Sequence, residues 1–214
     1  MSTDQAQTTL TLNQADLPEP YRSVQLLPFD SHGWHKVDNA ENLEKLIRDH
    51  KIQTIIEVGS WLGASTRHMA SLLPAGGKIY AVDHWLGSSE HQPGERGWHK
   101  ALAYLYEQFL SNVIHAGLTD KIVPIRMSSL EAAQQFSKFS KPLRPGLIYI
   151  DAGHETEAVY ADLKVWYPFV QNHGILCGDD WGWESVQAGV VMFANEKGLK
   201  IESSRSFWRL VEPC

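Results

Sequence analysis

The fold of this chain is decided by the stretch Thr54-Ile55-Ile56-Glu57-Val58-Gly59-Ser60-Trp61-Leu62-Gly63. Its apolar first half predicts a buried strand, and its two glycines predict a turn into a helix. A turn of this kind points backbone N–H groups and a helix N-terminus at a bound ligand. The glycine spacing is not the Gly-x-Gly-x-x-Gly of dinucleotide-binding folds. The acid two positions before the first glycine would repel a pyrophosphate, so it indicates a ligand that carries a cationic amino group.

Strand-like and helix-like segments alternate along most of the chain. The predicted parallel strands are Thr54–Val58, Lys78–Val82, Ile122–Ile125, Leu147–Ile150 and Ile175–Cys177. The predicted helices cover about 39–50, 64–72, 98–116, 130–136, 157–167 and 186–195. This alternation predicts an α/β fold with a doubly wound, mostly parallel, Rossmann-like sheet. Two short runs near the end, Leu199–Glu202 and Phe207–Val211, flank a turn and predict an antiparallel hairpin.

The chain divides into an N-terminal arm and one domain. Residues 1–38 lack the periodicity of the rest, and we expect a partly mobile arm there. Residues 39–214 form the predicted domain, because the sequence Asn39-Ala40-Glu41-Asn42 resembles a helix cap and opens the first periodic segment. At 214 residues and 43% hydrophobic composition, the chain has the size of a single globular domain.

Composition excludes several classes of partner. A net charge of −6 gives no basic surface for nucleic acid or for an anionic membrane. No apolar run reaches the roughly 20 residues of a transmembrane helix, and the first residues do not resemble a secretory signal. We therefore expect a cytoplasmic protein with a small-molecule partner. The arm and the many tryptophans also make a homodimer a reasonable expectation.

Polar and aromatic side chains follow every predicted parallel strand. They are Glu57, Gly59 and Trp61 around the end of the first, Asp83, His84 and Trp85 after the second, Ser128 and Ser129 after the third, Asp151 and His154 after the fourth, and Asp179, Asp180 and Trp181 after the fifth. In an open α/β sheet the ligand lies across the carboxyl ends of the strands. The sequence therefore predicts one binding site at this edge.

The glycine turn resembles the first motif of class I S-adenosylmethionine-dependent methyltransferases. The likeness extends over about residues 40–211, because that family ends its seven-stranded sheet with an antiparallel pair. It implies that S-adenosylmethionine is the cofactor. The residues expected to bind it are Glu57, Gly59, Trp61, Ser65, Asp83, Trp85, Ser128 and Ser129.

Three of these residues have specific expected roles and simpler alternatives. Asp83, at the end of a strand, is placed to accept hydrogen bonds from the ribose hydroxyls, and the alternative is a solvated turn aspartate. Ser65, in the first turn of a helix, is placed to hold the methionine carboxylate, and the alternative is an ordinary helix serine. Trp85 either stacks on the adenine, lines the mouth of the site or packs in the core.

The three acids Asp151, Asp179 and Asp180 predict a metal site. Carboxylates brought to one edge repel each other unless a cation neutralises them, and oxygen ligands suit Mg²⁺, Mn²⁺ or Ca²⁺ rather than zinc. They resemble the metal-binding acids of cation-dependent O-methyltransferases. The stretch from Tyr149 to Glu157 resembles the macrocin-type sugar O-methyltransferases, although Ala152-Gly153 and Thr156 depart from their Asp-Gly-x-His-x-Tyr pattern. The alternative is that the adjacent acids cap a helix and Asp151 only lines the cofactor pocket.

His154 is the candidate base. It falls where catechol-type relatives carry a lysine, and an imidazole that titrates near neutral pH suits removal of a hydroxyl proton. Alternatively it is polar surface, and water takes the proton. The loop at 87–97 has the composition of a lid over the substrate.

Together these features predict an S-adenosylmethionine-dependent O-methyltransferase that acts on a small-molecule hydroxyl with help from a divalent cation. The alternatives are a metal-independent methyltransferase, an NAD(P)-dependent oxidoreductase and a non-catalytic adenosyl-ligand binder. The oxidoreductase fits the fold class, but this chain lacks the glycine spacing of such enzymes.

Overall fold

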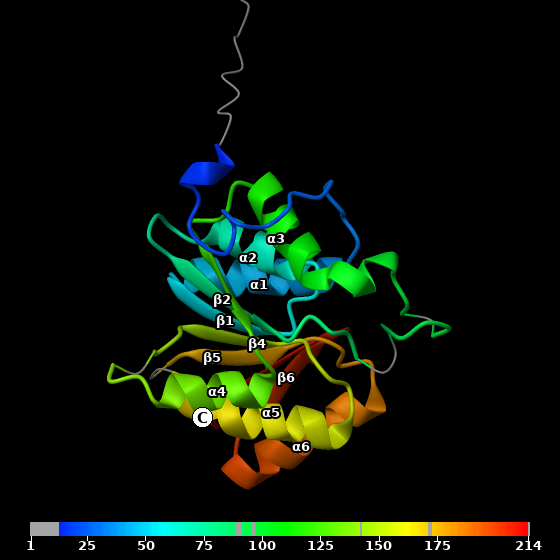
Figure 1. Ribbon diagram of the computed structural model, residues 1–214. Helices are drawn as coiled ribbons and strands as arrows, with labels where there is room; N and C mark the ends of the chain where they lie inside the picture. The colour runs from blue at the N-terminus through cyan, green and yellow to red at the C-terminus, as the bar shows by residue number, and fades with distance from the viewer. Residues whose placement is uncertain (1–12, 89–90, 96, 142, 171–172, 214) are drawn as a thin grey trace, which may run out of the picture.

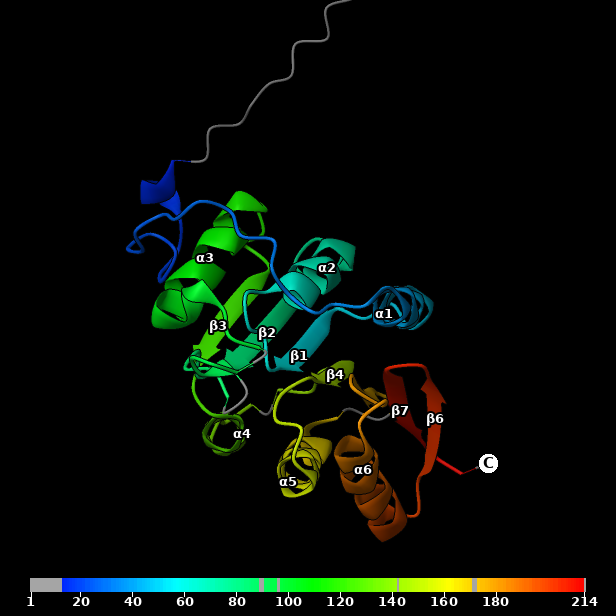
Figure 2. The ribbon, with the colours of Figure 1, turned by 90° about the vertical axis from the view of Figure 1, so that its right-hand side faces the viewer.

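The computed structural model describes residues 13–213 except 89–90, 96, 142 and 171–172. Within these residues a seven-stranded sheet lies between two layers of helices (Figures 1 and 2). The strands are β1 (Thr54–Val58), β2 (Lys78–Asp83), β3 (Ile122–Arg126), β4 (Leu147–Ile150), β5 (Ile175–Gly178), β6 (Lys200–Ser204) and β7 (Phe207–Val211). They are arranged in the order β3-β2-β1-β4-β5-β7-β6. The first five are parallel, and β7 is antiparallel to both β5 and β6, which confirms the predicted fold class.

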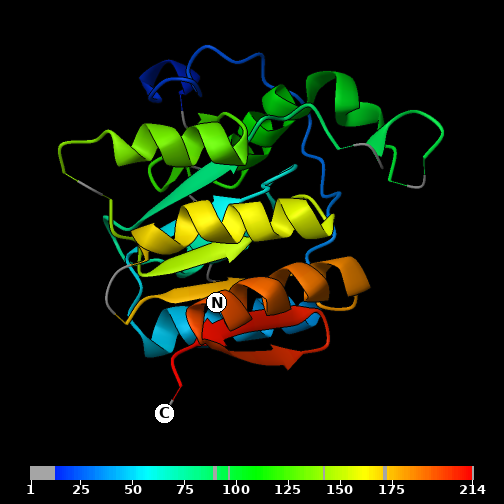
Figure 3. The same cartoon turned by 90° about the horizontal axis from the view of Figure 1, so that it is seen from below.

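Three helices cover each face of the sheet. On one face lie α1 (Val37–Asp49), α2 (Ala64–Leu72) and α3 (Leu105–His115), and on the other lie α4 (Ser129–Ser137), α5 (Thr156–Trp166) and α6 (Glu184–Lys197), as Figures 2 and 3 show. Each layer buries its own hydrophobic cluster against the sheet. In the described part of the chain, no helix is both long enough and apolar enough to span a membrane.

Helices α1, α4, α5 and α6 begin one or two residues before the predicted positions, and α3 begins seven residues after. Helix α1 starts at Val37, with Lys36 as its N-cap, so the predicted cap at Asn39 is wrong. In its first turn the Asp38 carboxylate accepts hydrogen bonds from the backbone N–H (3.0 Å) and the hydroxyl (2.9 Å) of Ser206, in the turn between β6 and β7. Helix α3 is preceded by a short 3₁₀ helix at Lys100–Tyr104, which accounts for the early predicted start.

Residues 13–36 pack along α3 on their way to α1 (Figure 1). The Tyr21 hydroxyl donates to the backbone oxygen of Ile122 (2.9 Å), and the Asp30 N–H donates to the Asn112 side chain (2.9 Å). These contacts carry the segment from β3, at one end of the sheet, to the carboxyl ends of the strands. Residues 1–12 of the predicted arm lie outside the described residues, and the domain boundary at 38/39 stays a prediction.

Backbone hydrogen bonds bring successive strand ends together. The N–H of Gly59 donates to Val82 (2.8 Å), that of Asp151 donates to Val58 (2.8 Å), and that of Asp179 donates to Ile150 (3.1 Å). Parallel pairing is thus continued by one residue beyond β1, β4 and β5. The polar residues that follow these strands consequently leave the sheet side by side.

Candidate active site

A cavity of about 900 Å³ opens at the carboxyl ends of the parallel strands. Its wall is formed by the loops after β1 to β5, by the N-terminal halves of α4 and α5, and by residues 33–36. It brings together most of the predicted site residues, namely Gly59, Trp61, Ser65, Asp83, Ser128, Ser129, Asp151, His154, Asp179 and Asp180. Glu57 and Trp85 are not in the cavity wall.

Glu57 lies beneath the glycine turn. Its fully buried carboxylate accepts hydrogen bonds from the hydroxyls of Ser60 (2.8 Å), Ser65 (2.5 Å) and Thr66. Burial raises the pKa of Glu57 to about 7, even though the three hydroxyls favour the charged form. The acid therefore ties the turn to the first turn of α2 and does not reach the ligand space. Because the Ser65 hydroxyl donates to Glu57, the backbone of Ser65 is the part available to a ligand.

Asp83 has the placement expected of a ribose-binding residue. One carboxylate oxygen accepts the N–H groups of Ser60 (3.1 Å) and Trp61 (2.9 Å), and the other accepts that of Trp85 (2.6 Å). Its side chain stays 15% exposed and lines the cavity, while burial raises its pKa. The three donors hold the carboxylate at the end of β2, next to the glycine turn.

Trp85 packs in the core, one of the interpretations that the sequence left open. Its side chain is 2% exposed and lies against Tyr106 and Phe109, with ring centroids 4.8 Å apart in both pairs. Its indole N–H donates to the backbone oxygen of Trp61 (2.7 Å). A ring enclosed in this way has no face left for adenine, so the cofactor-stacking interpretation of Trp85 is not supported.

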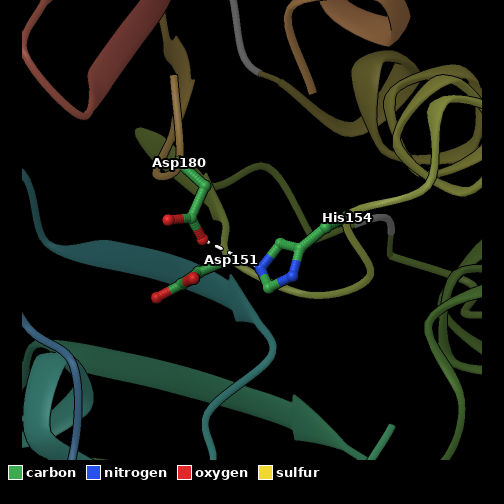
Figure 4. Close-up of side chains that lie close together, drawn as sticks. All are labelled: Asp151, His154 and Asp180. Carbon is green, nitrogen blue, oxygen red and sulfur yellow. Dashed lines mark ion pairs between the residues drawn. The ribbon is translucent and has the colours of Figure 1, made fainter. Parts of the chain in front are cut away.

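Asp151, His154 and Asp180, which all line the cavity, form a cluster (Figure 4). Each offers a potential metal ligand atom within 4.8 Å of the other two, and His154 Nε2 lies 2.9 Å from Asp180 Oδ2. Burial, together with the charges of Asp179 and Asp180, raises the pKa of Asp151 well above its usual value. The charged form of Asp151 is therefore disfavoured in this cluster.

Asp179 lines the same cavity but differs from the prediction in its local role. Its carboxylate accepts the backbone N–H of Asp180, and its own carbonyl accepts the indole N–H of Trp208 (2.7 Å). The predicted metal ligands are Asp151, Asp179 and Asp180, whereas the ligand atoms that lie close together belong to Asp151, His154 and Asp180. Asp179 thus shapes the loop that presents Asp180.

Residues 56–181, more than half of the 214, match a protein-family model described as a methyltransferase domain. The chain belongs to the methyltransferase domain family. Its fold is similar to that of the O-methyltransferase from Bacillus cereus in complex with SAH, with 17% identity, a TM-score of 0.62, and coverage of 87% of this chain and 84% of that one. It is also similar to the O-methyltransferase TomG from Streptomyces achromogenes, involved in tomaymycin synthesis and solved with SAM, with 13% identity, a TM-score of 0.62, and coverage of 84% and 82%.

One residue of the cavity wall, Lys36, is not predicted from the sequence motifs and lies before the region that matches the methyltransferase domain. Lys36 lies in the cavity wall, with its ammonium nitrogen 2.8 Å from Asp180 Oδ1 and 3.4 Å from Asp179 Oδ1. Burial alone would raise the pKa of Asp180, but hydrogen bonds from His154 and Lys36 bring this pKa below its usual value. A lone lysine in an arm without periodicity carries no signal, so only the fold reveals this contact.

Aromatic side chains form the mouth of the methyltransferase cavity. The ring of Trp34 stacks on that of His91 and also lies beside that of Trp61, with ring centroids 5.4 Å apart in both pairs. The ring centroid of Trp183 lies 4.7 Å from that of His154. Parts of the predicted lid at 87–97 lie outside the described residues, so its movement stays a prediction.

Proposed function

We propose that this protein transfers the methyl group of S-adenosylmethionine to a hydroxyl of a small molecule. The observation that carries the proposal is one cavity whose wall contains Asp83, the glycine turn and the Asp151–His154–Asp180 cluster. The family match supports methyl transfer, and the names of the structural neighbours support an oxygen acceptor.

Each part of the cofactor has a plausible chemical complement in the cavity wall. The lone pairs of the Asp83 carboxylate suit the two ribose hydroxyls. The N-terminus of α2 offers backbone N–H groups to the methionine carboxylate, since those of Gly59, Ser60 and Trp61 already donate to Val82 and Asp83. We assign the adenine to the start of α4, at Ser128 and Ser129, which also lines the cavity.

The acidic cluster is placed to activate the acceptor. Asp180 holds the His154 imidazole through the contact at Nε2, which stabilises the protonated ring. In the proposed reaction His154 takes the hydroxyl proton, the acceptor oxygen forms a bond to the methyl carbon, and the bond from that carbon to sulfur breaks. Positioning of the two reactants next to each other in the cavity supplies much of the rate increase.

We further propose that Asp151 and Asp180 hold a divalent cation, Mg²⁺, Mn²⁺ or Ca²⁺. The donor set fits, because both residues offer hard carboxylate oxygens whose ligand atoms lie close together. When bound there, such an ion would favour ionisation of an acceptor hydroxyl. In the metal-independent alternative, the Lys36 ammonium takes the place of the ion beside Asp179 and Asp180.

Replacing Asp83 with alanine is expected to weaken binding of S-adenosylhomocysteine by about 1–3 kcal/mol, because charge-assisted hydrogen bonds to the ribose are lost. Isothermal titration of the wild type and the variant measures the difference. Asp120→Ala, which removes an exposed acid, is the matched control. Equal affinity in wild type and Asp83→Ala, or preferential binding of NADH by the wild type, would contradict the cofactor assignment.

Replacing Asp151 with asparagine is expected to abolish the rise in melting temperature that Mn²⁺ gives the metal-free wild type. The reason is that the site loses one of its two carboxylates, and a cation stabilises only the state that binds it. Thermal denaturation with and without Mn²⁺ tests this, with Asp49→Asn on the exposed end of α1 as control. If Mn²⁺ leaves the wild-type melting temperature unchanged, the proposed metal site is wrong.

A further inference from the structure

Both carboxylate oxygens of Asp180 already have a partner. Oδ1 accepts a hydrogen bond from the Lys36 ammonium at 2.8 Å, and Oδ2 lies 2.9 Å from His154 Nε2. A divalent cation that binds through Asp180 must therefore share or replace one of these contacts. The two partners differ in chemistry, and that difference decides which one has to leave.

The imidazole of His154 is compatible with a neighbouring cation, whereas the ammonium of Lys36 is not. A neutral imidazole has a lone pair and carries no charge that repels the ion. An ammonium has three donors and no lone pair, and the positive charge of Lys36 lies beside Asp180 Oδ1, where it would repel a bound ion. Divalent-cation binding at Asp180 and the Lys36 contact therefore oppose each other.

Lys36 is able to leave without disturbing the fold. Its side chain is 43% exposed, and it reaches Asp180 on a flexible four-carbon stem. The backbone on either side is fixed by other contacts, from Asp30 to Asn112 before it and from Asp38 to Ser206 after it. Displacement of the ammonium consequently requires only a rotation of one side chain.

We propose that Lys36 is a tethered counter-cation that exchanges with the divalent ion. In the metal-free protein its ammonium neutralises Asp179 and Asp180, and when the ion binds it releases Asp180 Oδ1 and turns towards solvent. The inference rests on the proposed metal site and adds a competitor for it. The ammonium of Lys36 thus sets the affinity of the site for metal. Lys36 lies outside the region, residues 56–181, that matches the methyltransferase domain.

Isothermal titration of Mn²⁺ into the metal-free protein tests the exchange. Lys36→Met keeps most of the stem and removes the charge, and it is expected to bind Mn²⁺ about tenfold more tightly, because a competing charge-assisted contact is gone. Lys36→Arg keeps the charge and is expected to bind Mn²⁺ no more tightly than the wild type. Lys45→Met, at an exposed position on α1, makes the same change in net charge away from the cluster and is expected to leave the affinity unchanged.

Three results would overturn the exchange. They are equal Mn²⁺ affinity in Lys36→Met and the wild type, weaker affinity in Lys36→Met, and equal gains in Lys36→Met and Lys45→Met, which would reflect net charge alone. A parallel titration with S-adenosylhomocysteine separates the proposals. If all variants bind that ligand and none binds Mn²⁺, the exchange and the metal site are both wrong while the cofactor assignment stands.

Discussion

Replacing His154 with alanine is expected to lower kcat by about 10²–10⁴-fold and to leave the affinity for S-adenosylhomocysteine unchanged. The imidazole belongs to the acidic cluster and is held by Asp180, whereas the proposed cofactor-binding groups are Asp83 and the N-terminus of α2. Loss of a positioned base therefore affects the chemical step and spares cofactor binding. The measurement is steady-state methylation of an acceptor found by screening hydroxylated compounds, with His50→Ala at the exposed end of α1 as control.

The same variant distinguishes a base from a metal ligand. If His154 removes the proton, Mn²⁺ affinity in His154→Ala stays within a few-fold of the wild type. A fall in Mn²⁺ affinity of about tenfold or more would show that the imidazole contributes to the metal site, as loss of a supporting or direct ligand does. A kcat close to that of the wild type would remove His154 from the mechanism and leave water as the proton acceptor.

Replacing Gly59 with alanine is expected to cost about 3 kcal/mol or more of folding free energy and to abolish binding of S-adenosylhomocysteine. Gly59 has a φ of +92°, and a Cβ there would lie 1.8 Å from the backbone oxygen of Asp151. That overlap is with backbone, so it cannot be relieved by rotation of a side chain. The ends of β1 and β4 would have to separate, which moves both the glycine turn and the acidic cluster. Urea denaturation and ligand titration measure the two effects.

Gly76→Ala is the matched control for this substitution. Gly76 also has a positive φ, +79°, but a Cβ there meets nothing within 4 Å. It is expected to cost about 1 kcal/mol, the conformational part of the penalty alone. A similar loss of stability in Gly59→Ala and Gly76→Ala would show that the contact with Asp151 does not constrain the turn.

The sequence predicts the sheet and its functional edge because both depend on local patterns. Apolar runs that end in polar residues indicate parallel strands, and the carboxyl ends of such strands meet in space. That rule alone brings Asp83, Asp151 and Asp180 into one cavity, as the structure shows. The strand β1 and the helix α2 also begin and end at the predicted residues, because glycines and a proline bound them.

The features that the sequence did not predict depend on contacts between distant segments. Lys36 meets Asp180 across 144 positions, and Asp38, in the first turn of α1, meets Ser206 across 168 positions. The burial of Trp85 depends on α3. No periodicity or motif spacing encodes such pairings, because each is decided by packing of the complete domain.

The turn that contains Ser206 links the loop of the acidic cluster to the beginning of α1. The backbone oxygen of Ser206 accepts the N–H of Trp181, its N–H donates to the Asp38 carboxylate, and the indole N–H of Trp208 donates to the carbonyl of Asp179. Ser206 itself is not part of the cavity wall. A change in this turn would nevertheless reach two parts of the wall at once, namely the loop that presents Asp180 and the segment that carries Lys36.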